Sequence, residues 1–199
     1  MTTYTMSTGA GGIITFQPVE ISVPSGRRRL EIPWLSQLGP EAAYSNNDCG
    51  PADVAMIARW RGETLATVDT ASRATGLAKG YAYTMPGHLI TAARVFGINL
   101  AQATGLTISG LKADVDLGYP TIVLVHYATL PKRWDAKYKI GHWILVNGYT
   151  EVGTVLYHDP YWPDSTGRYI EITNDLLLRA MADCRLDGNT VNQGLRMAG

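Results

Sequence analysis

Helical and strand patterns are segregated along this chain, and their order constrains the fold more than any other feature of the sequence. Before residue 118, apolar residues recur at helical spacing in stretches that end near Gly62, Gly76 and Gly97. After residue 119, apolar runs are bounded by turn residues, as is typical of strands. A run of helices followed by a run of strands predicts an α+β fold.

Caps and breakers place the individual elements. The expected helices cover residues 51–60, 63–75, 86–96 and 107–117, with a closing helix at 175–183. The expected strands cover residues 120–127, 142–149, 154–159 and 167–172. Thr84 and Asn174 are the candidate N-caps of the third and closing helices, and Leu65 belongs to the apolar face of the second. The nearly continuous apolar run at 120–127 indicates a strand buried on both faces.

A cysteine lies at the start of the first helix, in the motif Asp48-Cys49-Gly50-Pro51. Pro51 suits a first helical position, where its missing N–H costs nothing. The positive end of the helix dipole favours a thiolate at Cys49 over a thiol, and the thiolate is the nucleophilic form. Most buried cysteines are only small apolar core residues, so Cys49 alone does not establish any chemistry.

Two downstream residues supply the partners that a nucleophilic cysteine needs. His142 opens one predicted strand, and Asp159 ends the next strand along the chain. Adjacent strands lie about 4.8 Å apart, so the two side chains can meet. His142 would pair with the thiolate and protonate the leaving amine, while Asp159 would orient the imidazole. Asn147 is the alternative orienter, but it lies five residues from His142 on one strand and therefore points to the opposite face.

Several motifs along the chain resemble those of a known family. Asp-Cys-Gly-Pro before a helix ending in Ile-Ala-Arg-Trp-Arg-Gly is similar to the active-site helix of bacteriocin-processing cysteine peptidases, a branch of the papain-like superfamily. The resemblance spans residues 30–172 and includes the motifs Ile32-Pro33-Trp34-Leu35-Ser36-Gln37, Gly118 to Val125, Gly141-His142 and Asp159-Pro160. The resemblance implies that Gln37 is an oxyanion donor, joined by the backbone N–H of Cys49. Twelve positions separate Gln37 from Cys49, which resembles the stand-alone relatives more than the transporter-linked ones.

This resemblance implies a papain-like fold, in which a helical N-terminal half with the cysteine packs on a C-terminal antiparallel sheet with the histidine and the aspartate. It also implies a thiol-dependent hydrolase that cleaves a peptide bond in a peptide, protein or peptidoglycan substrate. Two alternatives stay open: a peptidoglycan amidase or endopeptidase of the same superfamily, and a non-catalytic structural or binding module in a particle such as a phage virion. Substrate preference is expected to depend on the loops 38–48 and 129–140.

Composition argues against several other classes of protein. Lys plus Arg and Asp plus Glu both number 17, so there is no electrostatic case for a nucleic-acid partner. The two cysteines, Cys49 and Cys184, make no disulfide framework and are expected to be reduced. No metal and no other cofactor is expected, because no Cys/His cluster has zinc spacing and no glycine-rich loop follows a strand.

One domain with two extensions is expected from 199 residues. Residues 1–29 would form an arm or strand that could contact a partner protein, residues 30–184 the peptidase domain, and residues 185–199 a loose polar tail. No apolar run approaches the roughly 18 residues of a transmembrane helix. The N-terminus lacks the basic and apolar regions of a signal peptide, which favours a cytoplasmic location or packaging in a particle.

Overall fold

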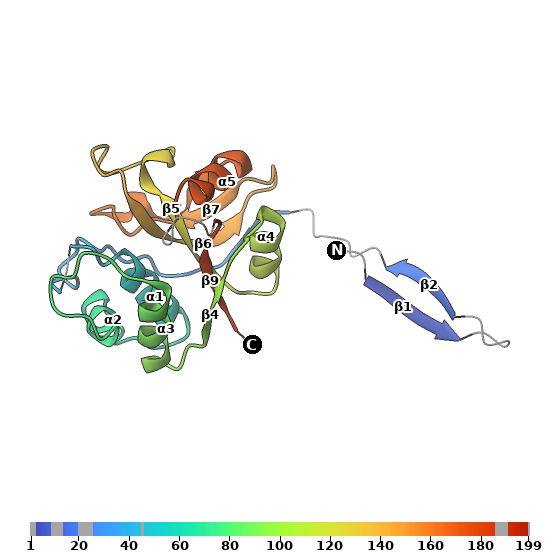
Figure 1. Ribbon diagram of the computed structural model, residues 1–199, viewed down its shortest axis with the longest axis horizontal. Helices are drawn as coiled ribbons and strands as arrows, with labels where there is room; N and C mark the ends of the chain where they lie inside the picture. The colour runs from blue at the N-terminus through green and yellow to red at the C-terminus, as the bar shows by residue number, and fades with distance from the viewer. Residues whose placement is uncertain (1–2, 9–13, 20–25, 45, 186–190, 199) are drawn as a thin grey trace.

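A seven-stranded antiparallel sheet with helices on both faces forms the body of the molecule (Figure 1). The computed structural model describes residues 3–8, 14–19, 26–44, 46–185 and 191–198. The helices are α1 (Cys49–Trp60), α2 (Val68–Ala74), α3 (Pro86–Val95), α4 (Ile108–Asp116) and α5 (Asn174–Ala182). The sheet strands are β3 (Arg28–Arg29), β4 (Leu100–Ala103), β5 (Thr121–His126), β6 (Gly141–Tyr149), β7 (Val155–His158), β8 (Ile170–Ile172) and β9 (Gly194–Met197).

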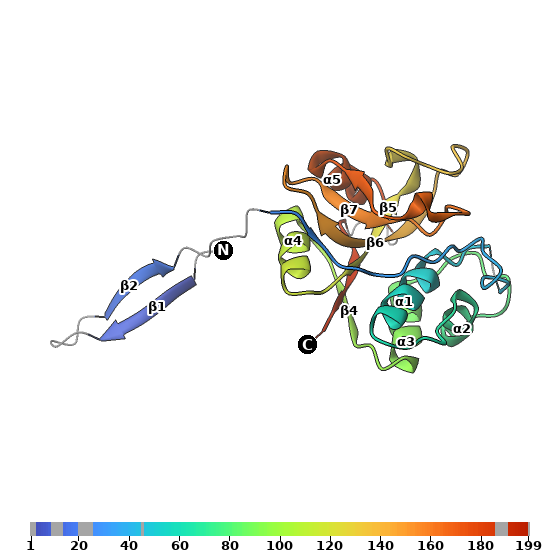
Figure 2. The same cartoon turned by 180° about the vertical axis from the view of Figure 1, so that it is seen from behind.

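The strands follow the order β4-β9-β5-β6-β7-β8, with β3 paired to the end of β6. Alternate residues of β5 enter two different cores. Ile122 and Leu124 pack with α1 and α3, whereas Val123 and Val125 pack with α5 on the other face. The views from both sides show α1–α3 and α5 on opposite sides of the sheet (Figure 2). The predicted strand buried on both faces is therefore present, and its period-two alternation explains how it serves both cores.

Helix α1 is the central helix of the first core. Every residue from Cys49 to Ala58 is buried. This burial explains why most of the surface of α1 carries no polar residue. The helix begins at Cys49, two residues before the expected start at Pro51, because the Ala52 N–H already donates to the Asp48 carbonyl at 2.8 Å. Gly62, with φ of 105°, follows the end of the helix in the left-handed conformation that its lack of a Cβ allows.

The structure corrects the expected start of α2 and the expected N-caps of α3 and α5. Helix α2 begins at Val68, because Thr67 and Thr70 form a reciprocal capping box, and this leaves Leu65 exposed before the helix. The N-cap of α3 is Met85 in place of Thr84, and the N-cap of α5 is Thr173 in place of Asn174. Boundaries of this kind are the least determined part of a sequence pattern, since several neighbouring residues can cap.

Strands β4 and β9 were not expected from the sequence. Residues 185–199 were expected to form a loose tail, but Gly194–Met197 pairs with both β4 and β5. Arg196 of β9 also donates through Nε to Asp114 of α4 at 2.8 Å. The ordered sheet thus extends past residue 184, where the expected domain ended.

Near the N-terminus, β1 (Thr3–Thr8) and β2 (Ile14–Val19) pair as an antiparallel two-stranded sheet. Among the described strands, neither pairs with the larger sheet. The proposed contact of residues 1–29 with a partner protein stays a prediction. No helix in the described ranges has both the length and the apolar character to cross a membrane.

Candidate active site

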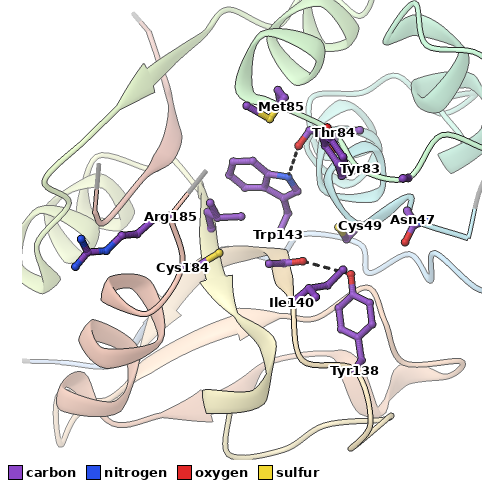
Figure 3. A pocket seen from close by; sticks show the side chains of 13 residues that line it. Asn47, Cys49, Tyr83, Thr84, Met85, Tyr138, Ile140, Trp143, Cys184 and Arg185 are labelled. Carbon is purple, nitrogen blue, oxygen red and sulfur yellow. Dashed lines mark hydrogen bonds between the residues drawn. The ribbon is translucent and has the colours of Figure 1, made fainter. Parts of the chain in front are cut away.

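Cys49 is the first residue of α1 and lies where this helix approaches the sheet. Its side chain is 7% exposed and is part of the wall of a cavity (Figure 3). The N–H groups of the first helical turn have no partner within the helix, so their partial positive charge is directed toward the sulfur. The cysteine thus lies at the helix N-terminus, where the sequence analysis expects it.

His142 and Asp159 meet as expected from the pairing of β6 with β7. Leu145 of β6 is opposite His158, the last residue of β7, so Asp159 directly after it lies near the start of β6. His142 Nε2 donates to Asp159 Oδ1 at 2.7 Å, and the two side chains are 1% and 0% exposed. A buried hydrogen bond of this length fixes the plane of the imidazole ring.

Backbone groups hold Asp159 from several sides. Its Oδ1 also accepts from the Tyr161 N–H at 2.9 Å, and its own N–H donates to the Gly167 carbonyl at 2.8 Å. Its carbonyl accepts from Trp34 Nε1 at 3.0 Å. Residues before α1 and residues after β7 therefore set the position of one carboxylate together.

His142 lies between Asp159 and Cys49. Burial by itself would lower the pKa of His142, but the charge and hydrogen bond of Asp159, and then the interaction with Cys49, raise this pKa to about 10. Because Nε2 is bonded to Asp159, the other ring nitrogen, Nδ1, is the one that is left for Cys49. At neutral pH the imidazole is consequently protonated, which stabilises a neighbouring thiolate.

Three tyrosine rings surround the imidazole of His142. The ring centroids of Tyr127, Tyr161 and Tyr138 lie 4.9, 6.0 and 6.3 Å from the centroid of the His142 ring. Edge and tilted ring contacts of this type favour a fixed ring orientation and keep water away from the hydrogen bond to Asp159. No sequence pattern marked this cluster, since Tyr127 and Tyr138 lie eleven residues apart in the β5–β6 connection and Tyr161 follows β7.

Gln37 lies between the loop before Cys49 and the turn after Asp159. Its side chain is buried, and Nε2 donates to the Asn46 carbonyl at 3.0 Å. Its backbone N–H donates to the Pro160 carbonyl at 2.8 Å. One amide hydrogen is thus used in the structure, which leaves the second hydrogen of Nε2 for another acceptor.

Asn147 lies at an irregularity of β6, where the register with β7 shifts between Val146 and Gly148. Its side chain is buried, and neither of its polar atoms has a hydrogen-bond partner among the described residues. The carboxylate of Asp159, and not this amide, bonds His142 in the structure.

Asp53 is a buried carboxyl group that the sequence analysis did not select. It is four residues after Cys49 on α1, and neither carboxyl oxygen has a hydrogen-bond partner in the described part of the chain. Burial raises the pKa of Asp53 well above its usual range, and Cys49 adds to this, although His142 opposes it. The raised pKa favours the uncharged form of this carboxyl group, which adds no negative charge beside Cys49. The spacing of four residues, which is one helical turn, was the available signal.

His158, which the sequence analysis left outside the chemistry, is a structural tether. Its Nε2 donates to the Ile32 carbonyl at 3.0 Å, and its Nδ1 accepts from the Tyr169 N–H at 3.0 Å. Burial lowers the pKa of His158 to about 4, so it is neutral at physiological pH. Among the described residues, no group of three or more His, Cys, Asp or Glu side chains is arranged to bind a metal.

Gly167 gives a test of how tightly Asp159 is held. A Cβ at this position would lie 2.3 Å from the Asp159 carbonyl oxygen and 2.8 Å from Trp34 Nε1. Gly167→Ala should therefore displace Asp159 and destabilise the protein by about 1–3 kcal/mol in thermal unfolding. Gly87→Ala is the matched control, because a Cβ there meets nothing within 4 Å. Equal unfolding temperatures for the two variants would contradict this tight packing.

Residues 29–182 match the model of the peptidase C39-like family. The fold is similar to the crystal structure of a Bacillus anthracis protein described as a C39-like peptidase, with a TM-score of 0.61 and 16% sequence identity, over 87% of this chain and 98% of that one. No curated protein matches the sequence. The α+β fold and the resemblance carried by the motifs are both confirmed.

Proposed function

The chain belongs to the peptidase C39-like family, and from this premise we propose that it is a thiol-dependent hydrolase with Cys49 as its nucleophile. The observation that carries the proposal is the buried hydrogen bond of 2.7 Å between His142 and Asp159, with Cys49 beside the same imidazole at a helix N-terminus. A nucleophile, a proton donor and an orienting carboxylate in this order are the parts that acyl transfer needs.

The proposed reaction has two steps. In the first, Cys49 Sγ attacks the carbonyl carbon of a peptide bond, the C–N bond breaks, and the imidazolium of His142 gives its Nδ1 proton to the leaving amine. This step leaves an acyl group on Cys49 as a thioester. In the second, His142 takes a proton from water, the hydroxide adds to the thioester carbonyl, and the C–S bond breaks to free the acid. Asp159 keeps the imidazole in place throughout.

Gln37 is proposed to stabilise the negative oxygen of both tetrahedral intermediates. The second hydrogen of its Nε2 and the backbone N–H of Cys49 would be the two donors. Gln37→Ala should therefore lower the rate of acylation by about 10²–10³-fold, the usual effect of one oxyanion donor. Alkylation of Cys49 by iodoacetamide should stay fast, since that reaction forms no oxyanion. A loss of alkylation equal to the loss of hydrolysis would instead assign Gln37 a role in shaping the site.

Selective alkylation tests whether Cys49 is the reactive thiol. Burial, and then the neighbouring Cys49, raise the pKa of Cys184 to about 11, so Cys184 is a protonated thiol at neutral pH. Iodoacetamide at about pH 6 should label Cys49 well before Cys184, because only Cys49 lies against the protonated His142. Peptide mapping of the labelled protein gives the result. Preferential labelling of Cys184 would overturn the assignment of the nucleophile.

Substrate screening separates peptidase activity from cleavage of peptidoglycan. The family supports a protein substrate in general terms, and the same set of side chains could act on a peptide cross-bridge. Unfolded proteins, short peptides and muropeptides should be incubated with the protein and analysed by mass spectrometry. Cleavage of muropeptides alone would identify an endopeptidase of the cell wall. The absence of any acyl-enzyme in intact-mass measurements would favour a non-catalytic module.

A further inference from the structure

The connection between β5 and β6 concentrates positive charge. Residues 132–139, called the basic loop below, hold four cationic side chains and one carboxylate, that of Asp135. The cations are Lys132, Arg133, Lys137 and Lys139. The whole chain has 17 Lys and Arg against 17 Asp and Glu, so its formal net charge is zero. The overall balance therefore hides a local excess of positive charge.

No carboxylate neutralises the basic loop. Its three lysines are exposed and its arginine is half-buried, and none of the four forms an ion pair within the described residues. Asp135 Oδ1 accepts instead from the backbone N–H of Lys137 at 2.8 Å. Asp183, from the end of α5, accepts from the Thr129 hydroxyl at 3.1 Å. Surface cations often serve only solubility, so their position in the fold has to carry any further argument.

Aromatic residues hold the basic loop against the rings that surround the candidate catalytic imidazole. The Trp134 N–H donates to Tyr127 Oη at 2.8 Å, and the Trp134 ring lies 6.0 Å from the Trp162 ring between centroids. The Tyr138 ring lies 5.1 Å from the Tyr161 ring. The loop is thus fixed to its surroundings at two residues that lie one on each side of Lys137.

Tyr138 also brings the basic loop to the nucleophile. This residue lines the same cavity as Cys49, and Lys137 and Lys139 are its two neighbours along the chain. Among the described residues that line this cavity, Arg185 is charged and none is Asp or Glu. A negatively charged group that approaches Cys49 from the basic loop therefore meets no carboxylate in the cavity wall.

The chemistry of the proposed reaction indicates which part of a substrate meets the basic loop. The leaving amine must reach His142, because it receives the Nδ1 proton there. The segment after this amine therefore begins among the rings around His142, and Tyr138 of the basic loop is one of these rings. An extended chain advances about 3.3 Å per residue, so the first few residues after the bond come within reach of long lysine side chains.

We propose that the basic loop is a docking surface for an acidic peptide segment, which carries Asp or Glu among the first few residues on the amine side of the cleaved bond. The inference rests on the proposed function, because the place of the leaving amine is taken from it. It adds a substrate class, in which carboxylates complement the four cations. Trp134, which is 51% exposed, offers apolar contact on the same surface.

Paired peptides test the basic loop without requiring turnover. Short fluorescent peptides of equal length carry Glu at every second position, or Gln in the matched set, and are titrated into the full-length Cys49→Ala protein. Fluorescence anisotropy should show that the Glu peptide binds about 5–30-fold more tightly than the Gln peptide, the effect of a few exposed charge pairs. The difference should vanish at about 1 M salt, where the screening length is about 3 Å. Equal affinity for the two peptides at low salt would overturn the proposal.

Two charge-reversed proteins locate the effect. Lys137→Glu with Lys139→Glu should lower the affinity for the Glu peptide by about 5–30-fold and leave the affinity for the Gln peptide unchanged. Arg61→Glu with Arg94→Glu is the matched control, because both arginines are exposed and the change in charge is the same. Arg61 follows the end of α1 and Arg94 lies in the last turn of α3, whereas the other ends of these helices lie at the cavity. Equal losses in the two double variants would assign the effect to net charge and overturn the proposal.

Protection of Cys49 shows whether the bound peptide lies at the candidate active site. In the wild-type protein the Glu peptide should slow the initial rate of Cys49 alkylation by iodoacetamide more than the Gln peptide does, as peptide mapping would show. Binding without protection would place the peptide away from Cys49 and contradict its role as a substrate. Tighter binding of a single-stranded oligonucleotide of equal charge would assign the basic loop to a nucleic acid and overturn the peptide proposal.

Peptide cleavage then separates the two proposals. Hydrolysis with no preference for Glu over Gln after the cleaved bond would contradict the docking surface and leave the hydrolase intact. Protection of Cys49 by the Glu peptide without hydrolysis of any peptide would support the docking surface and contradict the proposed function.

Discussion

Cys49→Ala is expected to abolish hydrolysis, with a loss of about 10⁵–10⁶-fold in kcat, because it removes the thiol that would form the thioester beside His142. The measurement is the cleavage of whichever peptide proves to be the best substrate, followed at enzyme concentrations high enough to detect this loss. Intact-mass analysis should find an acyl-enzyme with the wild-type protein after rapid quenching and none with the variant.

Two controls make this result specific to the thiol. Cys184→Ala removes the other cysteine of the sequence and should still cleave the substrate, since the proposed reaction forms no bond to Cys184. Thermal unfolding of Cys49→Ala should resemble that of the wild-type protein, because only one small side chain at the edge of the core is shortened. Full activity in a folded Cys49→Ala protein would end the thiol mechanism.

Asp159→Asn is expected to lower kcat by about 10³–10⁴-fold while Cys49 stays in place. The amide can keep one hydrogen bond to His142, but it has no charge to stabilise the imidazolium. Asn147→Ala is the matched comparison, since Asn147 lies on the same strand as His142 and its side chain has no hydrogen-bond partner among the described residues. A larger loss in Asn147→Ala than in Asp159→Asn would show that the orienting residue has been misassigned.

The pH dependence of Asp159→Asn gives a second measurement. In the wild-type protein Asp159 and Cys49 outweigh burial and raise the pKa of His142 to about 10, so activity should be lost on the alkaline side only near that pH. In the variant, no carboxylate offsets the effect of burial, so the pKa of His142 should fall. The alkaline limb of the activity profile should therefore move to lower pH. A pKa that is raised in the folded state adds stability below the unfolded value of about 6.5, and this stability is lost as the pH rises through about 10. The difference in unfolding temperature between wild type and variant should therefore be largest below about pH 6.5 and shrink toward pH 10. An unchanged alkaline limb would contradict the role of Asp159.

The sequence determined the features that depend on neighbours along the chain. The period of apolar residues and the glycines after the helices predicted α1, α3 and α4 closely, because helix formation depends on local spacing and caps. The hairpin of β6 and β7 followed for the same reason, since a short turn forces two successive strands to pair. That pairing brought His142 next to Asp159, so the central hydrogen bond of the candidate site could be predicted from the sequence.

The tertiary structure alone decided the features that join distant parts of the chain. Strand β9 is short, and its partners β4 and β5 lie about 70 or more residues earlier, so no local pattern marked it. The neutral character of Asp53 depends on burial against the sheet, which a helical period does not reveal. The cavity at Cys49 likewise needs residues from β5, from β6, from the segment before α3 and from the segment after α5. Local periodicity specifies which residues are buried, whereas only the packing of separate elements specifies what each buried residue contacts.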